Sequence, residues 1–362
     1  MNYTNNFAER KNLYFNSASS GVLTLNAVKE AKRYLDIMAL CADVRIDEYF
    51  EILDKAREGA AGIIGAEKKS IGLISNTTTG IFIVRNTFPE IKNIVIYGHG
   101  FPCTLAPFLH DGRYRVEVVS KDMNLLNKML SQINRSIVFV DLVDFLTGEL
   151  IDIDELTEVV HNHNSIVAVD AIQGAGYLPL SMKDSPTDFL FAGTSKWLLG
   201  PQGAGFIYIN EKHIEKSVFR NLGWLSLDYR DFDSFATLPE PRKDASGLES
   251  GTRNVIGAVM MKENLKFLNS VGIEEVYRHD LEGAEIIMKK AEMMGSVTQQ
   301  SGSMNTPIVS LKTRNIHHLY NYLSEHNVQV SFRENYIRIA YHIFNTAEEA
   351  EKLVEILDQY KL

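Results

Sequence analysis

Short apolar runs alternate with amphipathic helical stretches along the first two thirds of the chain. Most of these runs are hydrophobic almost throughout, which is typical of strands covered by helices on both faces. We therefore expect an α/β fold with a mainly parallel sheet, preceded by two amphipathic helices at Leu23–Leu40 and Ile46–Ile64. Seven runs predict its strands: Ile71–Ser75, Asn93–Tyr97, Tyr114–Val119, Ser136–Val140, Ile166–Asp170, Phe189–Ala192 and Gly205–Ile209.

The pattern changes after the seventh run. Asp, Arg and Pro replace periodicity over Leu222–Ala245, which predicts a long surface loop. The remaining patterns predict a smaller α+β unit packed on the sheet. Its predicted helices are Ile256–Ser270, Ile273–Met294, Ile316–His326 and Thr346–Gln359, and its predicted strands are Ile308–Lys312, Val328–Phe332 and Tyr336–Ala340. We expect a segment 1–20 that crosses to the small domain, a large domain 21–250 and a small domain 251–362.

Composition narrows the class of protein. The 362 residues are 45% hydrophobic and 23% charged, as in ordinary globular proteins. A net charge of −9 argues against nucleic-acid binding, which needs a basic face. The two cysteines, Cys41 and Cys103, cannot form a disulfide framework or a thiolate metal site, and they fit a reducing compartment. Because no apolar run approaches the ~18 residues of a membrane helix, we expect a cytoplasmic protein with no membrane, nucleic-acid or metal partner.

The strongest chemical signal is Lys196, which follows the predicted strand Phe189–Ala192 and precedes a glycine-rich turn. Ligands of open α/β folds bind at the carboxyl ends of the strands. Desolvation there would lower the pKa of the lysine and make its amine a nucleophile for a carbonyl group. This segment alone fits an exposed loop lysine equally well.

Two other segments fit the same edge of the sheet. Asp170 ends a predicted strand, although a helix cap or a turn is the more common role of aspartate there. A lysine imine and a rim carboxylate together suggest pyridoxal phosphate, whose ring nitrogen needs an acidic partner. The segment Ser75–Gly80 joins a strand to a helix, where free amides and the helix dipole favour a phosphate. Taken alone, that segment is more often a plain cap.

Together these residues resemble the class V aminotransferase superfamily of fold type I pyridoxal-phosphate enzymes. That group includes cysteine desulfurases, kynureninases and isopenicillin N epimerase-like proteins. The resemblance extends from Tyr14–Gly21 to Arg338–Thr346, and the segment Ser195–Gly203 is most similar to the epimerase-like branch. It implies a large cofactor-binding domain with a mainly parallel seven-stranded sheet and a smaller α+β C-terminal domain.

The resemblance also implies a role for each matching residue. Lys196 forms the Schiff base with the cofactor and moves protons at the substrate Cα, while Asp170 binds the ring nitrogen. Arg338 clamps the substrate α-carboxylate. Thr252 reaches the phosphate of the neighbouring subunit, which implies a homodimer with shared active sites. The other implied cofactor-binding residues hold the phosphate, the ring faces and the ring oxygen, and they are Thr77, Thr78, Phe101, Ala171, Gln173 and Ser195.

Three departures from the family pattern affect the interpretation. The asparagine that many relatives carry before Gly148 is missing, so either Gln173 binds the ring oxygen alone or Asp144 contributes. Ser195 occupies a position where relatives carry His or Tyr. No cysteine lies in the segment 331–336, and we expect neither Cys41 nor Cys103 to accept sulfur. The last departure counts against conventional cysteine desulfurase activity.

We therefore expect a pyridoxal-phosphate enzyme that acts on an amino acid, with aminotransferase as the first candidate. A lyase or an epimerase is the first alternative, because the same deprotonated substrate leads to all three reactions. The second alternative is a homologue that binds the cofactor without catalysis. A nucleotide-dependent enzyme is disfavoured, because the glycines of Gly200–Gly205 precede a strand and do not link a strand to a helix. The identity of the substrate side chain stays open.

Overall fold

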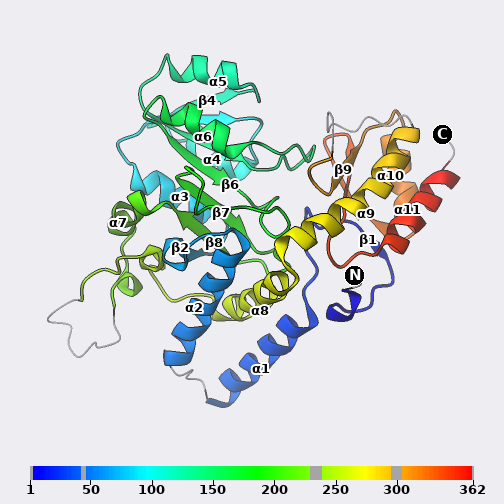
Figure 1. Ribbon diagram of the computed structural model, residues 1–362, viewed down its shortest axis with the longest axis horizontal. Coiled ribbons are helices and arrows are strands. Elements are labelled where there is room, and N and C mark those ends of the chain that lie inside the picture. The colour runs from blue at the N-terminus through cyan, green and yellow to red at the C-terminus, as the bar shows by residue number, and fades with distance from the viewer. Residues whose placement is uncertain (1–2, 42–45, 229–238, 295–303, 361–362) are drawn as a thin grey trace.

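Seven strands form a large sheet in the order β2-β8-β7-β6-β5-β3-β4 (Figure 1). Strands β4, β3, β5, β6 and β7 pair in parallel, whereas β8 is antiparallel to both of its neighbours. The predicted mainly parallel seven-stranded sheet is thereby confirmed. The strands are β2 (Ile71–Ile74), β3 (Asn93–Tyr97), β4 (Arg115–Val119), β5 (Ser136–Asp141), β6 (Ile166–Asp170), β7 (Phe189–Gly193) and β8 (Gly205–Ile209).

The computed structural model describes residues 3–41, 46–228, 239–294 and 304–360. Successive residues of its central strands enter different core layers. In β6, Val167 and Val169 belong to one hydrophobic cluster, whereas Ile166 and Ala168 belong to another. Because side chains alternate across a strand, this two-sided burial explains why the runs are apolar almost throughout.

Helices cover both faces of the sheet, and polar side chains cap several of them. Asn76 accepts a hydrogen bond from the Thr79 amide at 3.0 Å, which starts the helix that follows β2. The helices between strands are α3 (Thr77–Thr87), α4 (Pro102–Leu109), α5 (Met123–Leu130), α6 (Ile153–His161) and α7 (Glu211–Arg220). The longer helices outside this alternation are α1 (Leu25–Cys41), α2 (Ile46–Ile63), α8 (Val255–Val271) and α9 (Ile273–Met293). Short 3₁₀ helices are η1 (Thr4–Asn6), η2 (Lys68–Ser70), η3 (Trp224–Ser226) and η4 (Ala245–Leu248).

The C-terminal elements form a second group beside the large sheet (Figure 1). Their antiparallel sheet has the order β11-β12-β9. A separate parallel pair joins β1 to β10, so the start of the chain contacts the C-terminal group. The bounds are β1 (Leu13–Tyr14), β9 (Ile308–Leu311), β10 (Val328–Gln329), β11 (Ser331–Arg333), β12 (Tyr336–Ala340), α10 (Ile316–Glu325) and α11 (Ala347–Gln359).

Two expectations need qualification. The single strand predicted at Val328–Phe332 is wrong, because the chain leaves β1 after Gln329 and pairs with β12 from Ser331 onward. Of the predicted loop Leu222–Ala245, positions 229–238 lie outside the described residues. The division of the chain at residues 20 and 250 stays a prediction. Among the helices that the structure describes, none combines the length and the apolar character of a membrane span.

The N-terminal segment and the C-terminal group both reach the turn that follows β7. The amide of Gly21 donates to the Ser195 carbonyl at 2.7 Å, and a Cβ at Gly21 would lie 2.0 Å from the Lys196 carbonyl oxygen. On the other side, the Nε2 of His342 lies 2.9 Å from the Trp197 carbonyl oxygen, and its Nδ1 lies 2.6 Å from the Asp280 carboxylate. His342 and Asp280 are fully buried, so these bonds hold the turn that follows β7 against the C-terminal group.

A buried ion pair offers a test of how the layers are held together. The Arg57 guanidinium on α2 lies 2.7 Å from Glu249, whose carboxylate also accepts from the Leu73 amide of β2 at 3.0 Å. Removing one member of such a pair leaves an uncompensated charge. We expect Glu249→Ala to lower the free energy of unfolding by about 3–5 kcal/mol in urea denaturation. Glu58→Ala, which removes an exposed partner of Lys55 on the same helix, should leave the midpoint unchanged; equal midpoints for both variants would contradict the prediction.

Candidate active site

Lys196 lies in the turn after β7, beyond the carboxyl end of the parallel strands. Its Nζ is 5.7 Å from the centroid of the Phe101 ring. Within the described ranges, this amine makes no hydrogen bond or ion pair with another residue. Burial lowers the pKa of Lys196 to about 8, against the opposing charge of Asp170. A substantial fraction of the amine is therefore unprotonated and nucleophilic near neutral pH.

Asp170 ends the neighbouring strand β6 and is 4% exposed. Its Oδ1 accepts from the Ile172 amide at 2.9 Å, and its Oδ2 lies 3.8 Å from the Cys103 thiol. Desolvation raises the pKa of Asp170 to about 6, although the Ile172 amide and Lys196 both favour its anion. A buried carboxylate with so few donors gains from a cationic partner, which a protonated ring nitrogen provides.

Ala171 and Gln173 follow Asp170 closely in the chain, and both are buried. Gln173 Nε2 donates to the Ala18 carbonyl at 2.9 Å, and its Oε1 accepts from the Trp197 indole at 2.9 Å. Because the amide nitrogen carries two protons, one donor of Gln173 remains for a ring oxygen. The indole bond fixes the orientation of that donor.

Asp144 does not share this task in the observed arrangement. Its Oδ2 lies 2.7 Å from Lys121 Nζ, and its Oδ1 accepts from the amides of Leu146 and Thr147 at 2.8 Å. The carboxylate is therefore used to close the turn after β5. Of the two alternatives left open by the sequence, the geometry favours Gln173 acting alone.

Thr77 and Thr78 occupy the first positions of α3. Their amides have no carbonyl four residues earlier within the helix, and the helix dipole favours an anion there. Thr77 Oγ1 is 3.8 Å from the Cys103 thiol, which in turn contacts Asp170. The predicted phosphate position at the start of α3 and the acid Asp170 at the end of β6 therefore lie close together. Ser195 belongs to the same turn as Lys196, and its carbonyl accepts from Gly21.

Cys103 is a site residue that the sequence did not reveal. Cys103 is partly buried, and its thiol lies 3.8 Å from both Thr77 Oγ1 and Asp170 Oδ2. Burial and the nearby charge of Asp170 raise the pKa of Cys103 to about 12. The thiol therefore stays protonated, which suits packing better than nucleophilic attack. The side chain of Cys41 lies outside the described part of the structure.

Phe101 and Arg338 both contact Phe145. The Phe101 ring is 42% exposed and contacts the Phe145 ring edge to face, with centroids 5.3 Å apart. Arg338 is 3% exposed; it donates to the Phe145 carbonyl and to Ser19 Oγ, the latter at 2.7 Å. Its Nε is buried and has no acceptor among the described residues. Burial lowers the pKa of Arg338 to about 10, and a carboxylate ligand would satisfy the remaining donor.

Thr252 makes no hydrogen bond to another predicted site residue among the described residues. It is exposed, and within the described ranges no contact joins it to Lys196, Asp170 or Thr77. The next residue, Arg253, donates its amide to the Tyr49 hydroxyl at 2.8 Å. Sequence reasoning assigned no role to Phe145 and Ser19, because their contacts with Phe101 and Arg338 join segments far apart in the chain. It also assigned no role to Asp141, although the position of this acid at a strand end was a usable signal.

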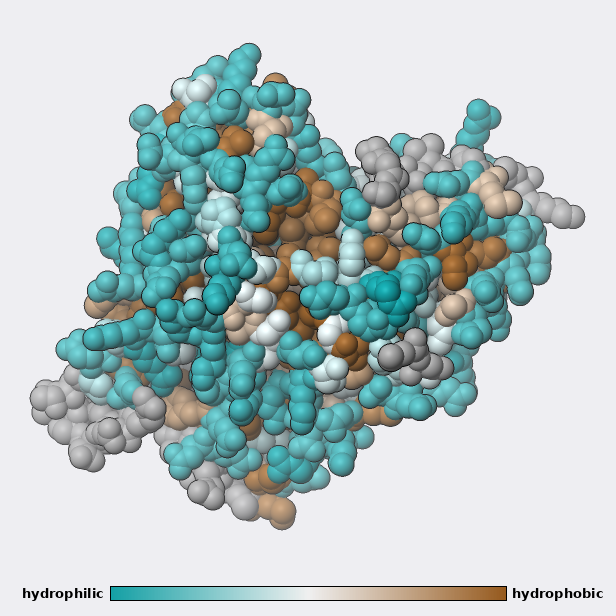
Figure 2. Space-filling view, in the orientation of Figure 1, coloured by the Kyte–Doolittle hydropathy of each residue, from teal (hydrophilic) through white to brown (hydrophobic). Residues whose placement is uncertain are grey.

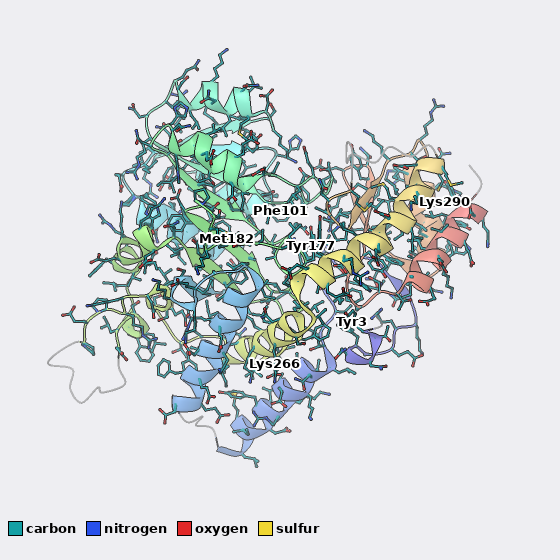
Figure 3. The ribbon with its side chains drawn as sticks, in the orientation of Figure 1. Tyr3, Phe101, Tyr177, Met182, Lys266 and Lys290 are labelled. Carbon is teal, nitrogen blue, oxygen red and sulfur yellow. The ribbon has the colours of Figure 1, made fainter. Side chains whose placement is uncertain are left out.

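The views of the molecule agree with this location. Figure 3 places Phe101 and Tyr177 between the large sheet and the C-terminal elements. In Figure 2, hydrophobic side chains gather in the same region, within a largely hydrophilic face.

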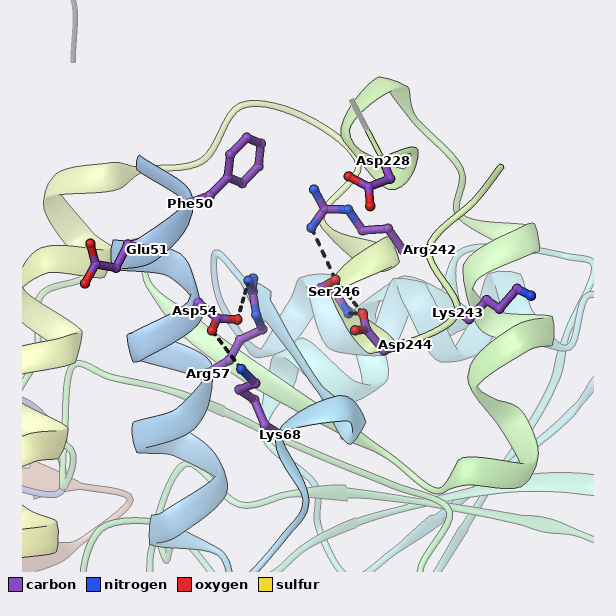
Figure 4. Close-up of a pocket in the computed structure, with 10 residues that line it drawn as sticks. All are labelled: Phe50, Glu51, Asp54, Arg57, Lys68, Asp228, Arg242, Lys243, Asp244 and Ser246. Carbon is purple, nitrogen blue, oxygen red and sulfur yellow. Dashed lines mark hydrogen bonds and ion pairs between the residues drawn. The ribbon is translucent and has the colours of Figure 1, made fainter. Parts of the chain in front are cut away.

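A separate hollow of about 630 Å³ contains none of the predicted site residues (Figure 4). Its Asp54 is already paired with Arg57 at 3.3 Å and with Lys68 at 2.7 Å, so this hollow is no second candidate.

Comparisons with known proteins point to one family. The model of the family described as aminotransferase class-V matches residues 13–353. An uncharacterized aminotransferase of Bacillus subtilis, YcbU, is 24% identical over 315 residues, which are 85% of this chain and 84% of that protein. Probable cysteine desulfurases and kynureninases are similar at 20% to 24% identity.

Solved structures share the fold. The cysteine desulfurase of Thermococcus onnurineus NA1 superposes with a TM-score of 0.82 at 18% identity, covering 96% of this chain and 94% of that one. The enzyme C-DES, with glycine covalently linked to its PLP cofactor, gives a TM-score of 0.84 at 18% identity, with 97% of each chain covered. Pyridoxal phosphate also suits the residues described above: an unpartnered lysine amine, a buried acid and the start of α3.

The titration of Lys196 gives a prediction about cofactor attachment. Because the unprotonated amine is the nucleophile, the rate of covalent attachment of pyridoxal phosphate to the cofactor-free protein should rise as pH increases from 6 and level off above about 8. Rapid mixing followed by borohydride trapping and peptide mapping measures this rate and locates the label. Lys266→Met, on α8, is the matched control and should behave as wild type. A rate that keeps rising to pH 10.5, or a label outside Lys196, would contradict the prediction.

Proposed function

The chain belongs to the aminotransferase class-V family, and from this membership we propose that it is an aminotransferase, which converts an α-amino acid into the corresponding keto acid. Its cofactor is pyridoxal phosphate. The observation that carries the proposal is the desolvated amine of Lys196 beside the buried Asp170, at the carboxyl edge of the sheet.

Each residue of the site has a separate role in the proposed reaction. Bound pyridoxal phosphate supplies an electron-withdrawing ring that stabilises negative charge at the substrate Cα. Lys196 would hold the cofactor and, with its amine free, would accept the substrate Cα proton and pass it to the cofactor carbon that transamination protonates. Asp170 keeps the ring nitrogen protonated, and Arg338 binds the substrate carboxylate. The other cofactor contacts are Thr77, Thr78 and Ser195 to the phosphate, Phe101 and Ala171 to the ring faces and Gln173 to the ring oxygen.

The surroundings of Lys196 favour transamination. Transamination needs a base that removes a proton from one carbon and delivers it to another, and Lys196 can do both. Elimination at Cβ instead sends that proton to the leaving group. Among the described residues in contact with Lys196, Asp170 or Phe101, there is no histidine, and the thiol of Cys103 holds its proton with a pKa of about 12. Proton donation to a leaving group would therefore depend on Lys196 itself.

A lyase that cleaves a bond at Cβ is the second candidate. It is favoured by the likeness to proteins named as desulfurases, kynureninases and the cystine C–S lyase C-DES. An epimerase would use the same lysine but return the proton to Cα. A cysteine persulfide mechanism is the least suited, because Cys103 is a protonated thiol and Arg333–Tyr336 is a tight hairpin without cysteine.

A panel of amino acids with and without a keto-acid acceptor tests the proposal. We expect keto-acid formation that requires the acceptor, with a loss of more than about 10³-fold in Lys196→Ala, since that variant lacks the general base. The products are measured by mass spectrometry and chiral chromatography. Racemised substrate, or a β-elimination product formed without an acceptor, would overturn the aminotransferase assignment in favour of the epimerase or the lyase.

We also propose that the protein is a cytoplasmic homodimer with shared active sites. Thr252 is exposed and separate from the site of its own chain, as a residue that serves a partner would be. Two large apolar side chains are exposed on α3 and η3: Phe82 is 38% exposed and Trp224 55% exposed. A bond between Asn86 and Asn221 at 3.1 Å joins their two segments. Such a patch fits an interface.

Mixed dimers test the sharing of sites. Lys196→Ala and Thr252→Ala each disable one role, and a mixed dimer has one site free of both changes if Thr252 serves the partner. Co-refolded or co-expressed variants should therefore recover about a quarter of wild-type activity, that is, one site in half of the randomly paired dimers. Sedimentation of each variant controls for dimer formation. Failure of the dimeric mixture to exceed the sum of its parents would contradict shared sites.

A further inference from the structure

A second acid lies beside Asp170 at the edge of the large sheet. Asp141 ends β5 and is the in-register neighbour of Asp170 on β6. Because paired strands are about 4.8 Å apart, the two carboxyl groups share one edge. Asp141 Oδ2 accepts from the Phe101 amide at 3.1 Å, whereas its Oδ1 is buried and has no hydrogen-bond partner in the described part of the chain. None of the roles proposed above uses this acid.

Two ionised carboxylates so close together repel each other. The groups that act on Asp141 are the acids Asp170 and Asp144 and, with opposite effect, Lys121 and the Phe101 amide. Burial and the two acids raise the pKa of Asp141 to about 8, while Asp170, which also faces Lys196, titrates near 6. Near neutral pH we expect the pair to hold one proton, and the ammonium of Lys196, which acts on Asp170, favours the charge on Asp170.

The bond to Asp141 fixes the segment that presents Phe101. That segment turns through Gly98 and Gly100, whose φ values are +90° and +61°, conformations that favour glycine. The Gly98 amide donates to the Val119 carbonyl at 2.8 Å, and the Phe101 amide donates to Asp141. The Phe101 ring, which lies near Lys196, depends on these two bonds for its position.

We propose that Asp141 is a positioning residue: as an uncharged carboxyl group it holds the backbone of Phe101, and with it the ring that faces the cofactor, while Asp170 carries the negative charge of the pair. The inference rests on the proposed function, because Phe101 is assigned there to the cofactor ring. Asparagine at position 141 would keep both the neutral charge and the acceptor oxygen, whereas alanine would keep neither the acceptor nor the shape.

Cofactor binding by four variants tests this proposal: Asp141→Asn, Asp141→Ala, Phe101→Ala and the double variant of the two alanines. Titration of the cofactor-free proteins with pyridoxal phosphate gives the dissociation constants. We expect Asp141→Asn to stay within about twofold of wild type and Asp141→Ala to bind about tenfold more weakly, as for the loss of one buried hydrogen bond. The double variant should bind no more weakly than Phe101→Ala, because Asp141 acts through Phe101. Asp152→Asn, at the cap of α6, is the matched control and should equal wild type.

Two outcomes of this titration would overturn the proposal. Equal losses in Asp141→Asn and Asp141→Ala would mean that a charge at position 141 is required. Additive losses in the double variant would mean that Asp141 acts independently of Phe101. If the wild type itself bound no pyridoxal phosphate, the proposed function would fail, and this result differs from both.

Infrared spectroscopy of the wild-type holoenzyme provides a readout that does not depend on activity or on the stability of the alanine variant. We expect the carbonyl band of a protonated carboxyl group at neutral pH, which disappears as pH rises past about 8. The band should be missing in Asp141→Asn and present in Asp152→Asn. A band that persists in Asp141→Asn would show that another group holds the proton and would overturn the proposal.

Discussion

Desolvation at the carboxyl edge of the large sheet is the constraint on which the site depends. Removing water favours the uncharged form of every ionisable group, so it lowers the pKa of Lys196 and raises that of Asp170. The same environment thus prepares a nucleophilic amine and an acid that gains from a nearby cation. Desolvation also raises the pKa of the Cys103 thiol, which therefore stays protonated. One physical cause therefore sets the state of all three groups.

The edge becomes a site only because segments distant in the sequence close over it. In the N-terminal segment, Gly21 contacts the turn that carries Lys196. His342, in the C-terminal group, makes a hydrogen bond to the same turn. Thr306 and Ser310 donate to carbonyl groups of the turn after β5, at Gly148 and Leu146. Because Ser310 pairs with Arg338 across β9 and β12, these bonds hold Arg338 close to the turn after β5. Motion between the two groups of elements would consequently change the site, because each group supplies part of it.

The reaction type depends on what surrounds the lysine. The family contains proteins that share this framework and are named for different reactions, from aminotransferase to desulfurase. All of them can begin with removal of the Cα proton, so the lysine and the acid define only the common first step. The groups near the lysine that can influence the later steps are the protonated thiol of Cys103, Ser195 and the aromatic pair Phe101 and Phe145.

The sequence by itself determined the sheet and the family, because the strands follow from local patterns and the family from its motifs. Apolar runs indicate buried strands, and a strand end fixes where Asp170 and Lys196 emerge. Only the tertiary structure decided which side chains meet there. The register of β5 against β6 places Asp141 beside Asp170, and the start of α4 brings Cys103 between Asp170 and Thr77. Asp144 is bound to Lys121, which no pattern predicted. Desolvation and hydrogen-bond partners are properties of neighbours in space, and neighbours in space are not encoded in any short stretch of chain.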